Sequence, residues 1–366
     1  MYSLTPGFRL PGIQRALSPA ETVMTKVNAG AGAALMASVS LGQSPPGWAF
    51  TAIAGIGGLI NFAPGQRSIG RWAAVGARYL RERAATPDLA TSQGATMTWT
   101  LYPHHGTMQD PYMRERWHVG FARALDYVAA QSRSAGLQVL VTHHAEVGES
   151  TAHTQTISVH IPKTVATRPD RALSAIEREL SRLGALTEVT PDPAPALCER
   201  STAWVALEDG RYASTARITG WPAETGGDLM ANLLLDQHRP LRARQHKNRS
   251  LAVLYRPLPR VQARRSAKFG RALGDAANTD AVKQDAHTEN SNTVHTALVQ
   301  GATLVDVDAY LTVWGDSPES VEEARHAAYL DADEHRISLD WLSGQQHRAH
   351  VMTSPHAAAS RKGAIL

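Results

Sequence analysis

Beyond residue 94 the hydrophobic pattern of the chain switches repeatedly between a period of two and a period near 3.6. The first pattern predicts half-buried strands and the second predicts amphipathic helices. The expected strands lie at 97–101, 137–141, 157–161 and 185–189, and the expected helices at 113–128 and 173–183. An apolar stripe from Leu173 to Leu183 marks the second helix, and Gly184 is predicted to end it. The order strand-helix-strand-strand-helix-strand is that of a split βαβ, ferredoxin-like unit.

A similar order follows the proline-rich stretch 191–195. Strands are predicted at 204–207, 211–219, 251–255, 305–313 and 337–339, and helices at 228–237, 318–330 and 344–352. A polar helical insertion is expected at 259–300 and a disordered tail at 354–366. The sequence therefore predicts an α+β fold with two tandem ferredoxin-like units, at 86–190 and 200–353, the second with a helical insertion.

The N-terminal region has a different pattern, because residues 27–66 contain no charged side chain. The segment 44–47 (SPPG) divides this run, since a helix cannot continue through two prolines. The halves, at about 27–43 and 47–63, reach the short limit for helices that span a bilayer. Small residues such as Gly30 and Gly58 could line their contact. This pattern predicts a membrane anchor within 1–85, a transmembrane helical hairpin; the alternative is an Ala/Gly-rich hairpin buried in a soluble core.

The charges that flank the hairpin predict its orientation. Lys26 precedes the first helix, several arginines between 67 and 83 follow the second, and the turn is uncharged. The positive-inside rule then places both termini and the bulk of the chain in the cytosol, with the protein in the cell membrane as a multi-pass protein. The single Cys198 excludes an internal disulfide and any metal site built from cysteine pairs.

Several segments of the second half carry a family resemblance. They are 212–222 (YASTARITGWP), 255–259 (YRPLP), 310–313 (YLTV) with the acidic helix 317–324 (SPESVEEA), and 342–349 (LSGQQHRA). Together with the hairpin and its arginines, they resemble EccE-like actinobacterial membrane proteins associated with type VII secretion and conjugative elements. They are also similar to the N-terminal, non-ATPase part of type IV secretion ATPases. The resemblance implies a structural or docking subunit of a membrane secretion or conjugation complex, with a translocation ATPase among its partners.

Catalytic motifs are not found in the sequence. It lacks both the Gly-x-x-x-x-Gly-Lys-Ser/Thr phosphate loop and a Gly-x-Ser-x-Gly elbow, so neither a motor nor a hydrolase is predicted and no cofactor is expected. A membrane-tethered enzyme with an unrecognised site stays open as an alternative. The sixteen histidines include His143, His144, His153 and His160, but neighbours on a strand point to opposite faces. Because zinc needs three or four converging ligands, no metal site is predicted.

Charge is strongly segregated in the second half, since 237–274 has many basic residues and no acid, whereas 275–340 is mainly acidic. A basic face of this kind could contact DNA or anionic lipid. The candidate patch consists of Arg242, Arg244, Lys247, Arg249, Arg264, Arg265 and Lys268. This gives a second function, a membrane-tethered DNA- or lipid-binding protein. The competing interpretation is that the basic and acidic segments pair with each other on folding.

Overall fold

The structure of the protein is a computed structural model that divides the chain into two compact units, residues 1–85 and 86–366. We call them the hairpin unit and the sheet unit. The structure describes residues 19–41, 45–61, 72–73, 75–77, 79–80, 94–105, 107, 110–131, 137–147, 151–166, 168–190, 197–222, 233–234, 249–258, 304–354 and 357–358.

The hairpin unit contains two helices that pack against each other, α1 (Pro19–Ser40) and α2 (Gly47–Asn61). Asn28 Nδ2 donates a hydrogen bond to the Ile53 carbonyl across this contact, at 3.2 Å. Gly57 makes the approach possible, because a Cβ atom there would lie 3.1 Å from Asn28 Nδ2. The small residues predicted for this role, Gly30 and Gly58, instead have open space beside them.

No helix in the described part of the chain is both long enough and apolar enough to cross a membrane. The helix α1 has 22 residues, but Glu21 and Lys26 lie within it, and α2 has only 15 residues. At 1.5 Å per residue, α2 is roughly 22 Å long, against about 30 Å for the hydrocarbon core of a bilayer. The spans predicted at 27–43 and 47–63 are therefore unsupported as membrane-crossing helices.

The sheet unit is an α+β structure, as predicted. Its strands are β1 (Gly94–Pro103), β2 (Gln138–Val147), β3 (Thr151–Pro162), β4 (Gly184–Glu188), β5 (Leu197–Arg200), β6 (Val205–Leu207), β7 (Tyr212–Gly220), β8 (Arg249–Pro257), β9 (Val305–Gly315) and β10 (Ser338–Trp341). Its helices are α4 (Pro111–Gln131), α5 (Pro169–Leu180), α10 (Pro318–Glu334) and α11 (Gln346–Val351). The insertion expected at 259–300 lies outside the described residues, and only 233–234 of the helix expected at 228–237 lie within them.

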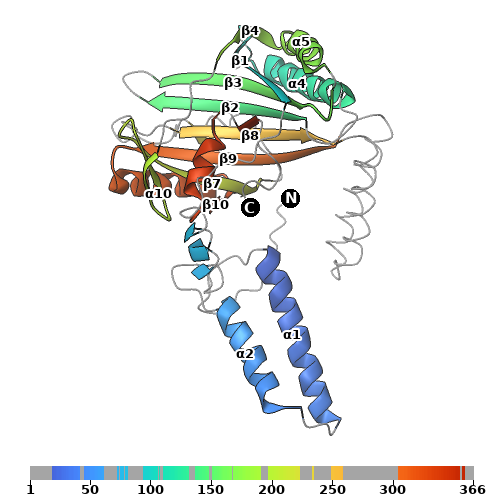
Figure 1. The fold of residues 1–366 in the computed structure, drawn as a ribbon, viewed down its shortest axis with the longest axis vertical. Coiled ribbons are helices and arrows are strands. Elements are labelled where there is room, and N and C mark those ends of the chain that lie inside the picture. Colours follow the sequence, from blue (N-terminus) through green and yellow to red (C-terminus); the bar gives the residue numbers. More distant parts are fainter. Residues whose placement is uncertain are drawn as a thin grey trace. The chain divides into compact units, whose positions relative to one another are not determined.

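All ten described strands belong to one antiparallel sheet (Figure 1). The first half of the sheet runs β4-β1-β3-β2, and the second runs β8-β9-β7, with β10 and the β5–β6 hairpin both beside β7. The order within the second half, β10-β7-β9-β8, repeats that of the first. The halves join where β2 pairs with β8, from Val139 opposite Tyr255 to Ala145 opposite Arg249. The two units predicted in tandem thus share one continuous sheet.

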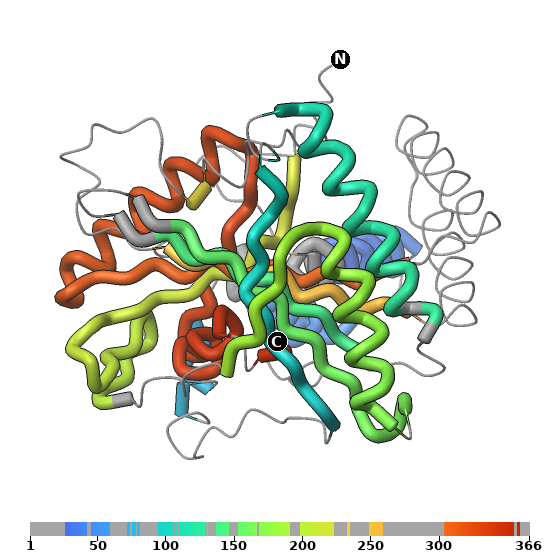
Figure 2. The backbone as a smooth tube through the Cα atoms, turned by 90° about the horizontal axis from the view of Figure 1, so that it is seen from above, coloured from blue at the N-terminus to red at the C-terminus, as the bar shows by residue number. Residues whose placement is uncertain are grey.

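The helices α4, α5 and α10 cover one face of this sheet. Under α4 and α5 the core contains alternate strand residues such as Trp99, Val141 and Ile157, and Figure 2 shows these two helices side by side. Under α10 the core continues with Val253 and the alanines of that helix. Because Val253 pairs directly with Val141, both cores lie on the same face of the sheet.

The opposite face is covered in its second half by α11 and the residues that follow it. Leu140, Leu254 and Tyr310 point to this side and pack with Ala357 and Ala358, which are fully buried. The prediction of a disordered tail from residue 354 is therefore wrong at these two positions, because small alanines fit closely against the sheet.

One glycine has a different role from the one predicted. The helix α5 ends at Leu180, before Gly184, and its C-cap residue is Ser181. Gly184 instead begins β4, where a Cβ atom would lie 2.2 Å from the Tyr102 carbonyl oxygen. The glycine is needed for close approach of two strands, a role that a helix-end pattern does not reveal.

Candidate functional site

A groove with a volume of about 870 Å³ lies along α4, beside the end of α5. The start of α4 is fixed by local capping, because Asp110 Oδ1 accepts a hydrogen bond from the Tyr112 amide at 2.9 Å. Pro111 occupies the first helical position, which suits a residue without an amide proton. The cap therefore fixes the register in which the next turns of α4 face the groove.

The closeness of α4 and α5 depends on Gly120. A Cβ atom at this position would lie 2.9 Å from Leu183 Cδ2, and both residues line the groove. Across the groove, Thr107 donates two hydrogen bonds to the His104 carbonyl, from its amide at 3.1 Å and its hydroxyl at 2.7 Å. The wall that faces α4 is therefore held by its own hydrogen bonds.

Trp117 is the main aromatic residue of the groove. Its ring stacks on Phe121 with the centroids 5.4 Å apart and the planes 6° from parallel, and Phe121 in turn meets the Tyr255 ring edge-on. The Trp117 Nε1 atom is buried and has no hydrogen-bond partner within the described part of the chain. The groove thus offers a fixed apolar surface.

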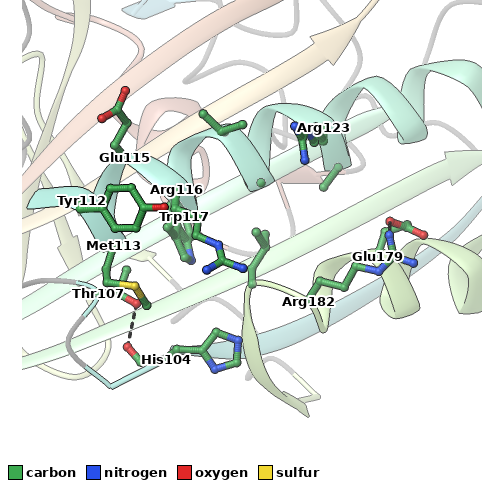
Figure 3. A pocket seen from close by; sticks show the side chains of 14 residues that line it. His104, Thr107, Tyr112, Met113, Glu115, Arg116, Trp117, Arg123, Glu179 and Arg182 are labelled. Carbon is green, nitrogen blue, oxygen red and sulfur yellow. Dashed lines mark hydrogen bonds and ion pairs between the residues drawn. The ribbon is translucent and has the colours of Figure 1, made fainter. Parts of the chain in front are cut away.

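The arginines around the groove differ in whether they form an ion pair with a described residue. Arg182 is paired with Glu179, with Nη1 and Oε2 2.7 Å apart. Arg116 and Arg123 make no ion pair with any described residue, and both are exposed on α4. Figure 3 shows Arg116 extending into the groove, whereas Glu115 points away from it. An apolar surface flanked by unpaired arginines suits recognition of a partner protein, because Trp, Tyr, Met and Arg are enriched at protein interfaces.

The sequence alone does not reveal this groove. A weak signal was present, since Arg116, Val119 and Arg123 are spaced to share one helix face. That face mixes charge with an exposed valine, which predicts a helix surface but not a hollow beside it. The hollow depends on α5, which is far away in sequence.

Of the predicted anionic-ligand patch, only Arg249 lies among the described residues. It is 1% exposed, and its guanidinium donates to Asp331 Oδ2 at 2.6 Å and to the Leu233 carbonyl at 2.7 Å. Arg249 is therefore a buried structural residue and is unavailable to DNA or lipid. Arg242, Arg244, Lys247, Arg264, Arg265 and Lys268 lie outside the described residues.

A second arginine of the basic segment is also paired with an acid. Arg256 and Arg217 both donate to the carboxylate of Asp308, and Arg256 also donates to Gln138. Burial would raise the pKa of Asp308, but the hydrogen bonds and charges of the two arginines outweigh it and hold this pKa below its usual value. The described parts of the basic and acidic segments thus pair with each other.

Several of the described histidines lie close to one another or to a serine. His143 Nδ1 lies 3.3 Å from His153 Nε2, and on the other sheet face His144 Nδ1 lies 2.6 Å from Ser250 Oγ. Within the described ranges, no three His, Cys, Asp or Glu side chains are arranged to hold a metal ion. Burial, and then the neighbouring His153, lower the pKa of His143 to about 4, so this ring is neutral at pH 7.

His350 on α11 is the most isolated of the buried histidines. It is 5% exposed, and neither ring nitrogen has a hydrogen-bond partner among the described residues. Its ring meets Trp314 edge-on at 5.4 Å, and Arg211 lies over the same tryptophan. Burial, and then the charge of Arg211, lower the pKa of His350 to about 4, although Asp209 opposes this shift.

Comparison with known proteins provides no family for the chain. No protein-family model matches it, and no curated protein matches it.

Proposed function

We propose that this protein is a non-catalytic docking subunit that inserts its hairpin unit into the cell membrane and binds partner proteins through its sheet unit. The observation that carries the proposal is the exposure of large apolar side chains on both helices of the hairpin. Met36 on α1 is 66% exposed and Trp48 on α2 is 70% exposed, and Val27, Ile56 and Leu41, which directly follows α1, are also on the surface. An apolar surface of this kind is typical of a segment that lies in lipid or against another protein.

The polar groups of the hairpin are compatible with insertion. Neither 27–41 nor 45–61 contains a charged residue, and each helix satisfies most of its backbone internally. The Asn28 amide donates to the Ile53 carbonyl of the partner helix, so one polar side chain is used inside the pair. A hairpin shorter than the hydrocarbon core can be accommodated when the bilayer thins locally around it.

The direction of insertion is also part of the proposal. A hairpin has both ends on the same side, and Lys26 with the arginines between 67 and 83 would keep that side cytosolic. The sheet unit would then face the cytosol. Its partners would be other subunits of a secretion or conjugation complex of the type VII or type IV kind, including a translocation ATPase, as the sequence resemblance suggests.

The docking part of the proposal is supported by the composition of the groove on α4. Tyr112, Met113 and Trp117 supply apolar contact area, and Arg116 and Arg123 supply unpaired charge. These residue types are the ones that commonly contribute most to binding between proteins.

Extraction of the tagged full chain in mild detergent, followed by mass measurement of the particle, tests this function. We expect a particle larger than the 39.5 kDa chain, containing a membrane-bound ATPase or other subunits. A lone monomer or dimer with no co-purifying subunit would contradict the docking role. Recovery of the intact chain in the soluble fraction would contradict the membrane role.

A further inference from the structure

We infer that the groove on α4 binds an acidic segment of a partner protein, in which one large apolar side chain packs against Trp117. This inference rests on the proposed docking function and names the chemistry of the partner. It concerns a surface that is lined by His104, Tyr112, Met113, Arg116, Arg123 and Leu183, among others.

The acidic character of the partner follows from the two arginines of the groove that form no ion pair with a described residue. Arg116 and Arg123 are exposed on α4 and have no ion pair among the described residues, whereas nearby Arg182 is already neutralised by Glu179. A guanidinium can form two parallel hydrogen bonds with a carboxylate, so an aspartate or glutamate suits these sites geometrically. Because both arginines lie on a helix rather than on a loop, only their side chains, and not their backbone, need to be ordered on binding.

The apolar anchor follows from the floor of the groove. Trp117 is held by its stack on Phe121, so its exposed edge is already in place before a partner arrives. Tyr112 is 70% exposed and Val119 is also exposed, which leaves apolar surface uncovered on either side.

A nucleic acid fits this surface less well than an acidic protein segment. Glu179 also lines the groove, and its carboxylate would repel a continuous phosphate backbone. Discrete carboxylates can be placed opposite Arg116 and Arg123 and away from Glu179. The combination of two separated cations with an aromatic floor therefore favours a peptide with spaced acidic residues.

Selection of displayed random peptides on the purified full chain tests this inference. The variant Arg116→Glu/Arg123→Glu reverses both free charges, and Arg171→Glu/Arg178→Glu makes the same charge change at exposed positions of α5 outside the groove. Peptides that bind the wild type and the α5 variant, but not the groove variant, are the ones that use the groove. Thermal unfolding of all three proteins checks that the sheet unit is intact.

We expect the groove-dependent peptides to be rich in Asp and Glu around one aromatic or large aliphatic residue. One such peptide, synthesised and titrated, should bind the groove variant about tenfold or more weakly than the wild type, and binding should weaken as salt rises. Peptides without acidic residues, peptides that bind both variants equally, or duplex DNA that binds in the groove better than any peptide would each overturn the inference. So would a selection that returns no groove-dependent peptide.

The same samples separate this inference from the proposed function. The charge reversals lie in the sheet unit and leave the hairpin unchanged, so both variants should associate with membranes as the wild type does. Acidic-peptide binding by a chain that stays in the soluble fraction would refute the membrane role and keep the inference. Membrane association without groove-dependent binding would refute the inference and keep the membrane role.

Discussion

The hairpin unit and the sheet unit use the same kinds of residue in opposite ways. In the sheet unit Trp99 is 0% exposed, packed between strands and the helices α4 and α5, whereas in the hairpin unit Trp48 is 70% exposed. Two helices alone bury only one stripe each, while a sheet covered by helices encloses the apolar side chains that lie between the layers. The difference shows that the sheet unit supplies its own apolar surroundings. The hairpin unit leaves its apolar side chains uncovered.

The largest expected effect comes from truncating the two tryptophans in turn. Trp99→Ala should lower the free energy of unfolding of the sheet unit by about 3–5 kcal/mol, because it leaves a cavity in a closed core. Trp48→Ala should leave that value unchanged, since its side chain is exposed, and should weaken membrane association instead. Urea denaturation of both full-length variants in mild detergent measures the first quantity. If both substitutions lowered the free energy of unfolding equally, the contrast between a closed core in the sheet unit and an exposed surface in the hairpin unit would be wrong.

The next effect concerns a buried charge in the sheet unit. Arg249→Ala should destabilise the sheet unit by about 3 kcal/mol, because Asp331 and the Leu233 carbonyl each lose a buried partner. Arg171→Ala, on the exposed face of α5, is the matched control and should change stability by less than about 0.5 kcal/mol. If Arg249→Ala is as mild as the control, Arg249 is not the structural residue described above.

A smaller effect should appear on acidification. Because burial lowers the pKa of His350 from 6.5 to about 4, only the unfolded chain takes up this proton between those values. The free energy of unfolding should therefore fall as pH drops from 6.5 to about 4, by at most about 1.4 kcal/mol per pH unit for this group. Below about pH 4 both states carry the proton, and this contribution becomes constant.

Two variants isolate His350 from the other titrating groups. His350→Phe should reduce the fall in stability between pH 7 and pH 5, and should stabilise the protein at pH 7 by about 1 kcal/mol, since two unpartnered nitrogens leave the core. His350→Gln should reduce the pH dependence equally without the gain at pH 7. An unchanged pH profile in both variants would show that the ring is not buried as described.

The smallest effect tests a local feature of α10. The Ser317 side chain accepts a hydrogen bond from the Ser320 amide at 3.2 Å and caps this helix. Ser317→Ala should cost about 1 kcal/mol, measured by urea denaturation, whereas Ser317→Asp should retain most of the stability. A neutral Ser317→Ala would mean that packing of the α10 alanines alone holds the helix in place.

Much of the sheet unit could be predicted because several of its strands and helices carry clear apolar periods. The strict alternation of 305–313 corresponds to β9 (Val305–Gly315), and the stripe that starts at Leu173 corresponds to α5. The strand β5 was missed because its four residues, LCER, are too few to show a period. It exists through pairing with β6, which is a tertiary effect.

Two larger features could not be predicted from periodicity. A period of two shows which face of a strand is buried but not which strand lies beside it, so the pairing of β2 with β8 was invisible. If the two halves were separate sheets, β2 and β8 would each be an edge strand open to a partner. Their pairing removes both edges. Likewise, the groove arises where α4 and α5 meet. The residue pattern of one helix can show a surface but not the hollow that a second helix forms beside it.

Flotation of the full chain with vesicles of phosphatidylcholine and phosphatidylglycerol tests the central claim most directly. Met36→Arg/Ile56→Arg places charge on exposed positions of the hairpin unit, and Tyr329→Arg/Leu330→Arg places the same charge on comparably exposed positions of α10. We predict that the wild type and the α10 variant float with the vesicles, even in high salt, and that the hairpin variant does not. A wild-type chain that stays at the bottom of the gradient as a monodisperse protein, without detergent, would contradict membrane insertion.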